Sequence, residues 1–331
     1  LGEGAAWFFS ASSWEGLFGA IRAAVGSTPG KGTGLLLVFG LLLGLRRPMR
    51  RRMKHLAGQV TTPATDSYRA TLGTLLYTVL LAAPLPLALY LLGQALQSGD
   101  VSPFLFATGR ALPFVAWILA LLDLIRQTLA PDGLAEVHFG WPSELTRSIH
   151  RGLLWPEIAF IPLGFVSIQI AMSGMQLESP EQLQIYNNSF GRIVFIVGLV
   201  ALGLALLGLF RPRKHVEKPR LKLANAWLHR LYVYVYLVVL LGTFLPALLA
   251  ALGYYITGFL LAYQVLRMVW LAVVLLLLAG MLLRWRECQR RALQTEGDGE
   301  SDDAELPKTE EQVRQLFRAA IILLAAAGLY S

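Results

Sequence analysis

The chain has 331 residues, of which 55% are hydrophobic and 15% are charged. In soluble domains about a quarter of the residues are charged, so this composition excludes an ordinary soluble domain and favours an integral membrane protein. The net charge of +8 could suggest a nucleic-acid partner. However, the basic residues border apolar runs, which is typical of membrane flanks that meet anionic lipid headgroups. We therefore predict membrane lipids as partners and no nucleic acid.

The N-terminal stretch, residues 1–31, is an aromatic segment interspersed with Gly, Ala and Ser. Its clusters include Trp7, Phe8 and Trp14. Aromatic side chains gather at membrane interfaces, so we predict an amphipathic segment on the outer face of the membrane.

The long apolar runs predict an all-α, polytopic helical membrane protein with about seven to eight transmembrane helices. A helix needs about 20 apolar residues to cross the hydrocarbon core, and the runs lack the alternating period of a membrane barrel. The first run contains Gly40 and Gly44 at a spacing that permits close helix packing, although such spacing also arises by chance. The runs lie at about 32–45, 70–96, 104–125, 153–173, 190–210, 230–250 and 257–283, and an eighth begins near Phe317.

The basic residues orient these helices. If the runs cross the membrane in alternating directions, 24 of the 29 Lys and Arg residues fall on one side. Short loops with this bias stay in the cytoplasm, so we predict a periplasmic N-terminus for this chain. The residues expected to anchor the helices at the inner leaflet are Arg46, Arg47, Arg50, Arg51, Arg52, Arg211, Arg213, Lys214, Arg284 and Arg286.

Several predicted spans contain proline. A proline removes a backbone hydrogen bond and kinks a helix, which would give a curved or deformable bundle. Alternatively, proline is simply more frequent in membrane helices than in soluble ones. The predicted kinks are at Pro84, Pro86, Pro113, Pro162 and Pro246.

Few ionisable residues lie within the spans. Asp123 and Glu157 are near cytoplasmic ends, and Arg110 and Arg192 are near outer ends, so each can reach an interface. Arg267 lies deeper, unless 254–268 is an interfacial helix that precedes a shorter span. Since no row of acidic residues crosses the bilayer, an ion-coupled transporter is disfavoured.

The sequence does not predict an enzyme. The five histidines lack the spacing of a zinc-binding helix, and no Gly-Lys-Ser/Thr phosphate loop is present. Cys288 is the single cysteine, so it supports neither a disulfide nor a cysteine-based metal site. We expect no catalytic residue, cofactor or metal.

The composition changes near the end of the chain. Residues 293–314 are rich in Asp and Glu and cannot bury enough apolar surface to fold, so we predict an acidic cytoplasmic linker. It separates a seven-span module, 32–292, from 315–331, which we interpret as the start of the next transmembrane helix.

An ordered set of short motifs resembles the inner-membrane domain of the large MscS-like mechanosensitive channels, of the MscK (KefA) or MscM type. The cytoplasmic connection carries the most extensive match, with Gly133, His138, Trp141 and Pro142 as its family-like residues. The motifs occupy 71–72, 83–87, 129–142, 190–192, 211–213 and 253–257.

The resemblance implies a specific role. In that family the module is an array of extra transmembrane helices between a periplasmic region and an MscS-type pore core, and the channels are homoheptamers. We therefore expect a paddle that senses membrane tension during hypo-osmotic shock, in the inner membrane of a Gram-negative bacterium. The pore core would lie beyond residue 331. The alternative from the residues is a multi-pass carrier or a membrane scaffold.

Overall fold

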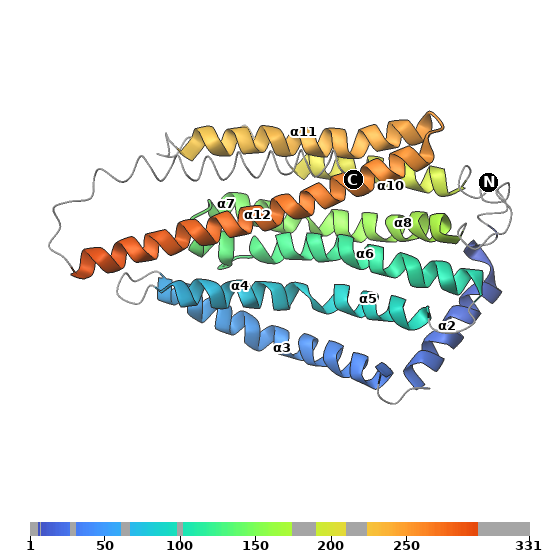
Figure 1. The fold of residues 1–331 in the computed structure, drawn as a ribbon, viewed down its shortest axis with the longest axis horizontal. Helices are drawn as coiled ribbons and strands as arrows, with labels where there is room; N and C mark the ends of the chain where they lie inside the picture. Colours follow the sequence, from blue (N-terminus) through green and yellow to red (C-terminus); the bar gives the residue numbers. More distant parts are fainter. Residues whose placement is uncertain are drawn as a thin grey trace.

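A computed structural model gives the fold of the chain (Figure 1). It describes residues 6, 8–26, 31–60, 67–97, 102–173, 190–209 and 224–296, and every regular element within these ranges is a helix. The elements are α2 (Ala11–Gly26), α3 (Lys31–Val60), α4 (Tyr68–Ala82), α5 (Pro84–Leu96), α6 (Pro103–Thr128), η1 (Leu134–His138), α7 (Ser143–Gly152), α8 (Leu154–Ser173), α10 (Arg192–Leu209), α11 (Ala224–Ala251) and α12 (Tyr255–Glu296).

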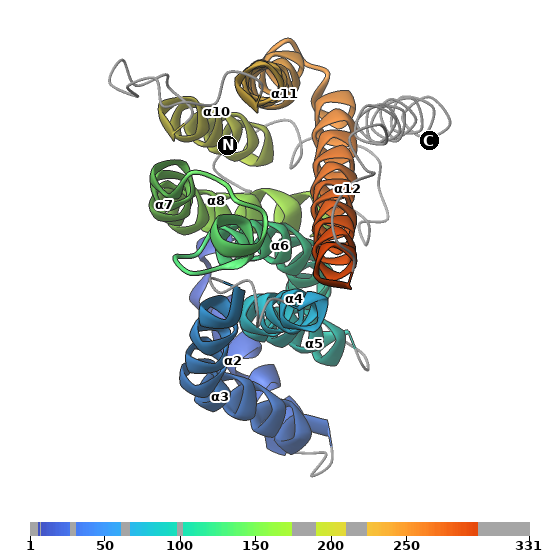
Figure 2. The same ribbon diagram turned by 90° about the vertical axis from the view of Figure 1, so that its left-hand side faces the viewer.

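The long helices run in alternating directions along one axis. In Figure 1, α3 runs toward the left, α4 and α5 toward the right, α6 toward the left, and the alternation continues to α12, which slants across the others. Figure 2 looks along this axis and shows α6 near the centre, with α3 and α11 at opposite edges. The alternation places the basic ends of the helices at the left-hand end in Figure 1, which we call the basic end.

Fewer helices qualify as membrane spans than the sequence predicted. Among the described residues, four helical stretches are long and apolar enough, and the bent pair α4–α5 makes a fifth. The run 32–45 fails because the second half of α3 is basic. At about 1.5 Å per residue, its apolar part covers only about 21 Å of a hydrocarbon core of about 30 Å. In α11 the span criterion rests on Tyr236–Ala251 alone, because the side chains of the preceding turns lie outside the described residues. The predicted eighth span lies outside the described residues.

The N-terminal segment packs across the end of the bundle opposite the basic end. Phe8 and Leu17 are buried against α5 and α6, where they contact Leu96 and Phe104. The Trp14 Nε1 donates to the carbonyl of Phe8 at 2.7 Å. Leu17 of α2 is therefore part of the protein core, while Phe18 of the same helix and Phe9 before it remain exposed.

Glycines allow α5 and α6 to approach closely. A Cβ atom added at Gly93 would lie 2.6 Å from Pro113 Cδ and 2.9 Å from the carbonyl oxygen of Gly109. Gln97 connects the same two backbones, because its Nε2 donates to the carbonyl oxygens of Gly93 at 3.0 Å and Gly109 at 2.8 Å. By contrast, Cβ atoms added at Gly40 or Gly44 would meet nothing within 4 Å. These two glycines do not mediate packing among the described residues.

The predicted prolines behave differently from one another. Pro84 coincides with a break at which α4 and α5 meet at a 48° bend, and Pro86 lies in the first turn of α5. Pro113, Pro162 and Pro246 lie inside α6, α8 and α11, which continue through them. The interrupted span therefore contains two prolines close together, Pro84 and Pro86, rather than a single one.

Candidate functional site: a polar cluster beside a bent span

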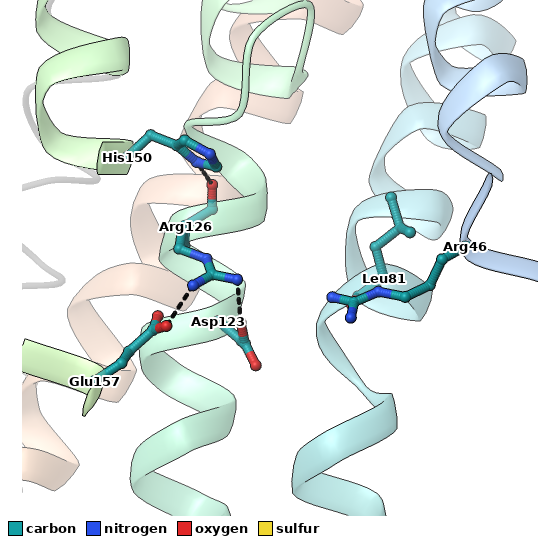
Figure 3. A network of polar contacts seen from close by, with 6 residues as sticks. All are labelled: Arg46, Leu81, Asp123, Arg126, His150 and Glu157. Carbon is teal, nitrogen blue, oxygen red and sulfur yellow. Dashed lines mark hydrogen bonds and ion pairs between the residues drawn. The ribbon is translucent and has the colours of Figure 1, made fainter. Parts of the chain in front are cut away.

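A buried cluster of charged side chains lies where α6 meets α8, near the basic end (Figure 3). The Nη1 atom of Arg126 lies 2.5 Å from Glu157 Oε2, and its Nη2 lies 3.5 Å from Asp123 Oδ1. Asp123 and Glu157 are only 6% and 8% exposed. Breaking such a buried pair leaves an uncompensated charge and is strongly destabilising. The cluster therefore fixes the position of α8 relative to the end of α6.

His150 extends this cluster to α7. Its Nδ1 lies 2.8 Å from the backbone carbonyl oxygen of Arg126. Because a carbonyl only accepts hydrogen bonds, Nδ1 carries the proton. The last four carbonyls of a helix have no partner within the helix, and His150 satisfies one of them at the end of α6. This contact fixes α7, a short helix, against the same end of the bundle.

Arg46 likewise forms a hydrogen bond with a backbone carbonyl, at the bent span α4–α5. Its Nη2 donates to the carbonyl oxygen of Leu81 at 3.4 Å, and Figure 3 shows both residues beside the cluster. Leu81 lies in the last turn of α4, directly before the break at Pro84. Pro84 and Pro86 have no N–H to donate to the carbonyls of residues 80 and 82, so regular helical bonding is interrupted on either side of Leu81. Arg46 thereby connects the middle of α3 to the hinge between α4 and α5.

The connection at 129–142, which carries the family-like motif, is buried between α4, α6 and α12. Leu134, which begins the single helical turn η1, is fully buried and packs against Leu277 and Met281 of α12. The His138 Nδ1 and the Thr71 hydroxyl lie 3.0 Å apart in the protein interior. The conformation of the connection thus depends on α4 on one side and on α12 on the other.

Two glycines permit this packing. A Cβ atom added at Gly133 would lie 2.6 Å from the Ala130 carbonyl oxygen. One added at Gly280 of α12 would lie 2.6 Å from the Phe139 ring. Trp141 is half-buried and donates its backbone N–H to the Ala135 carbonyl oxygen at 2.9 Å. Pro142 precedes α7 and is exposed.

Two exposed ion pairs flank this connection. Lys54 on α3 lies 3.7 Å from Asp132, and Arg147 on α7 lies 3.2 Å from Glu136. Exposed pairs of this kind contribute about 0–1 kcal/mol each. Their main effect is to neutralise charge locally, so that these cations are engaged within the protein.

The predicted inner-leaflet anchors fall into different environments. Arg47, Arg50, Arg51 and Arg52 are exposed along α3, whereas Arg46 is half-buried. Arg284 is only 8% exposed, and Arg286 is half-buried. The remaining three anchors, Arg211, Arg213 and Lys214, lie outside the described residues.

The other ionisable residues of the spans also have protein partners. Arg192 donates to the carbonyl oxygen of Ala251 at the end of α11, and the Arg110 guanidinium lies 5.4 Å from the Phe106 ring centroid. Arg267 is 3.3 Å from Gln264 Oε1. It lies within α12, one continuous helix from Tyr255 to Glu296, so the alternative of a separate interfacial helix at 254–268 is wrong.

Sequence reasoning placed Asp123 and Glu157 at an interface and did not connect them to Arg126. One signal was available, since Asp123 and Arg126 are three residues apart on one helix and so share a face. The partner Glu157 follows 31 residues later along the chain. Nothing in its local sequence indicates that its helix packs against α6 at that level.

These observations define the class of protein: an all-α, polytopic membrane protein whose helices meet at a polar cluster and a buried connection. Among the described residues, the cluster and the connection hold the helices in register.

The comparisons with known proteins identify the family. The model of the mechanosensitive ion channel inner membrane domain 1 matches residues 32–300, and the chain belongs to this family. It is therefore a member of a mechanosensitive, MscS-like ion channel family, which is not an enzyme class, and it resides in the inner membrane.

One similar protein is the miniconductance mechanosensitive channel MscM of Escherichia coli (strain K12). It is 26% identical over 264 residues, which cover 78% of this chain and 22% of the MscM sequence. The chain therefore spans about a fifth of the length of the curated relative that it matches. No solved structure matches the chain.

Proposed function

We propose that this chain is the peripheral, membrane-sensing paddle of a mechanosensitive ion channel that opens under membrane tension during hypo-osmotic shock. The observation that carries the proposal is the family match across residues 32–300. The similarity to the E. coli MscM channel supports it.

The surface of the bundle suits a paddle immersed in lipid. Many large apolar side chains are exposed, among them Leu76, Leu204, Leu248 and Leu260. The helix α12 is the least buried of the four stretches that qualify as spans. In water such a surface would be unfavourable, whereas in a bilayer it is solvated by acyl chains.

A tension sensor needs two states that differ in membrane area or shape, since a bias acts only through such a difference. The break at Pro84 lies between α4 and the closely packed pair α5–α6, and Arg46 of α3 contacts its α4 side at Leu81. A change of this bend would alter the cross-section of the module while the α5–α6 contact stays intact. The bent span is thus the element we assign to the tension response.

The remaining parts of the proposal follow from charge and family. The basic end would face the cytoplasm and the N-terminal segment the periplasm of a Gram-negative bacterium. Residues 32–292 would form the sensor module, 293–314 an acidic linker, and 315–331 the start of the helix that leads to the pore core. The full-length protein would assemble as a homoheptamer.

The test uses the full-length protein in cells that lack their own mechanosensitive channels. We expect survival of a hypo-osmotic downshock and a tension-gated current in excised patches. A variant with an altered bent span should shift the tension threshold. Absence of both rescue and current would contradict the proposal. Substrate-dependent flux through the isolated chain in liposomes would instead support a carrier.

A further inference from the structure

The helix α3 carries a shallow, open surface depression, which we call the groove, on the side that faces away from the bundle. Its volume is about 310 Å³, and it is lined by Pro48, Arg51, Arg52 and His55. These residues are three or four positions apart and therefore share one face of the helix. Met53 and Ala57, on the opposite face, are buried against the bundle. The groove therefore combines an apolar wall with two guanidinium groups and an imidazole.

The charge in this groove is not neutralised by the described part of the chain. Two other cations near the basic end have acidic partners: Lys54 pairs with Asp132, and Arg147 with Glu136. No side chain among the described residues forms an ion pair or hydrogen bond with Arg51, Arg52 or His55. A concentration of unpaired donors within one concave surface attracts an anion.

The position of the groove along α3 matches the headgroup layer of a membrane. The exposed apolar residues of α3 end at Leu45, and Arg51 follows six residues later, about 9 Å along the helix. The headgroup region is about 5–8 Å thick on each side of the hydrocarbon core. The helix α3 runs obliquely to its neighbours in Figure 1, so each of its residues advances less than about 1.5 Å along the bundle axis. Headgroup phosphates therefore lie at the level of the groove.

We propose that this groove binds the phosphate of an anionic phospholipid in the leaflet at the basic end. Planar guanidinium groups match phosphate oxygens with paired hydrogen bonds, and the adjacent Leu41 and Leu45 offer an apolar path for acyl chains. That path favours a lipid over a soluble phosphate. The inference rests on the proposed function in one respect, the assignment of this leaflet as cytoplasmic. It adds a defined lipid-binding site to that function.

The test measures lipid binding to the purified 331-residue chain in detergent by native mass spectrometry. Phosphatidylglycerol is titrated against the chain, with phosphatidylcholine as the neutral lipid. The double variant Arg51→Gln/Arg52→Gln removes the groove cations. The double variant Arg47→Gln/Arg50→Gln removes the same charge from α3 outside the groove and is the matched control.

We expect selective binding of phosphatidylglycerol. The groove variant should bind it roughly thirtyfold more weakly, because each basic residue at a lipid surface contributes about a factor of five. The control should lose less than about fivefold, because its charges act on the site only from a distance through screened electrostatics. Both variants should keep the helical circular dichroism and the unfolding temperature of the parent chain, since their side chains are exposed.

Three outcomes would overturn the inference. Equal losses in both double variants would indicate diffuse attraction to the whole helix. Equal binding of phosphatidylcholine would exclude recognition of an anionic headgroup. Displacement of the lipid by millimolar inorganic phosphate would indicate a site for soluble phosphate. The measurement detects lipid binding and not ion current. A channel that fails to respond to tension would therefore contradict the proposed function while leaving selective lipid binding intact.

Discussion

The guanidinium of Arg126 at the end of α6 lies 2.5 Å from the carboxylate of Glu157 in the first turn of α8. The same guanidinium contacts Asp123, and the backbone carbonyl of Arg126 contacts His150 of α7. One residue thereby joins three helices at a single level of the bundle. Any motion of α8 relative to α6 must either carry this cluster along or break it.

Replacement of Glu157 by Gln should destabilise the bundle. The substitution leaves Arg126 with a weaker partner in a largely buried position, and removal of one member of a buried pair costs about 3–5 kcal/mol. We expect the free energy of unfolding, measured by denaturant titration in detergent, to fall by an amount near the lower end of that range. The amide can still accept a hydrogen bond, and Asp123 retains its own contact with Arg126.

The control for this prediction is Arg147→Gln, which breaks the exposed pair with Glu136. It should change the free energy of unfolding by less than about 1 kcal/mol. Equal effects of the two substitutions would show that the Arg126 cluster is no more important than a surface pair.

Substitution of Pro84 by Ala should straighten the α4–α5 span. Alanine restores a backbone N–H that can donate into the preceding turn and removes the steric clash of the proline ring. We expect a bend smaller than the present 48°. Spin labels placed in α4 and α5 would then lie farther apart in pulsed electron resonance measurements on the chain in nanodiscs.

Pro162→Ala offers the comparison, because Pro162 lies inside the uninterrupted α8. Labels on either side of it should keep their separation. If Pro84→Ala also leaves the label distance unchanged, packing by Arg46 and the neighbouring helices holds the bend, and the proline does not.

Replacement of Gly93 by Ala should disrupt the α5–α6 contact. The new methyl group would approach Pro113 Cδ to 2.6 Å and the Gly109 carbonyl oxygen to 2.9 Å, closer than van der Waals contact allows. Overpacking of this kind costs about 1–3 kcal/mol, visible as a lower thermal unfolding temperature in detergent.

The matched substitution is Gly40→Ala, in a helix where nothing lies within 4 Å of the added atom. It should be neutral or stabilise by about 0.5–1 kcal/mol, because alanine has the higher helix propensity. A loss of stability in this variant would reveal a close neighbour of α3, such as a second copy of the chain.

The orientation of the chain can be tested by cysteine labelling in cells. In a Cys288→Ser background, Gln182→Cys should react with an impermeant maleimide from the periplasm, and Val60→Cys should react only after the inner membrane is opened. This pattern follows from retention of basic flanks in the cytoplasm. The reverse pattern would invert the proposed topology and would place the groove on α3 in the other leaflet.

Several features of the fold were predictable because they depend on local patterns. Apolar runs predicted an all-helical membrane protein, and the double proline at 84 and 86 predicted the interruption that the structure places between α4 and α5. Among the described residues, fewer helices qualify as spans than the sequence predicted. An apolar run predicts burial in lipid only if it is also long enough, and the run in α3 gives way to arginines after residue 45.

The candidate site was less predictable. His138 attracted attention through a family resemblance, but its bond to Thr71 spans 67 positions along the chain. Arg126 and Glu157 are separated by 31 positions, and Arg46 reaches a carbonyl 35 positions away. Such pairs depend on which helices pack against each other and on how far those helices are shifted along the bundle axis. A local sequence pattern determines neither property.

By itself, the sequence determined the helical class, the alternation of the helices and the side on which the basic residues gather, because hydrophobic length and flanking charge act locally on each segment. Only the tertiary structure decided which charges are available to a ligand. It buries Arg126 with Asp123 and Glu157, it directs Arg46 to the broken end of α4, and it leaves Arg51 and Arg52 facing outward. The physical reason is that the state of a charge depends on its neighbours across helices, and helix packing sets those neighbours.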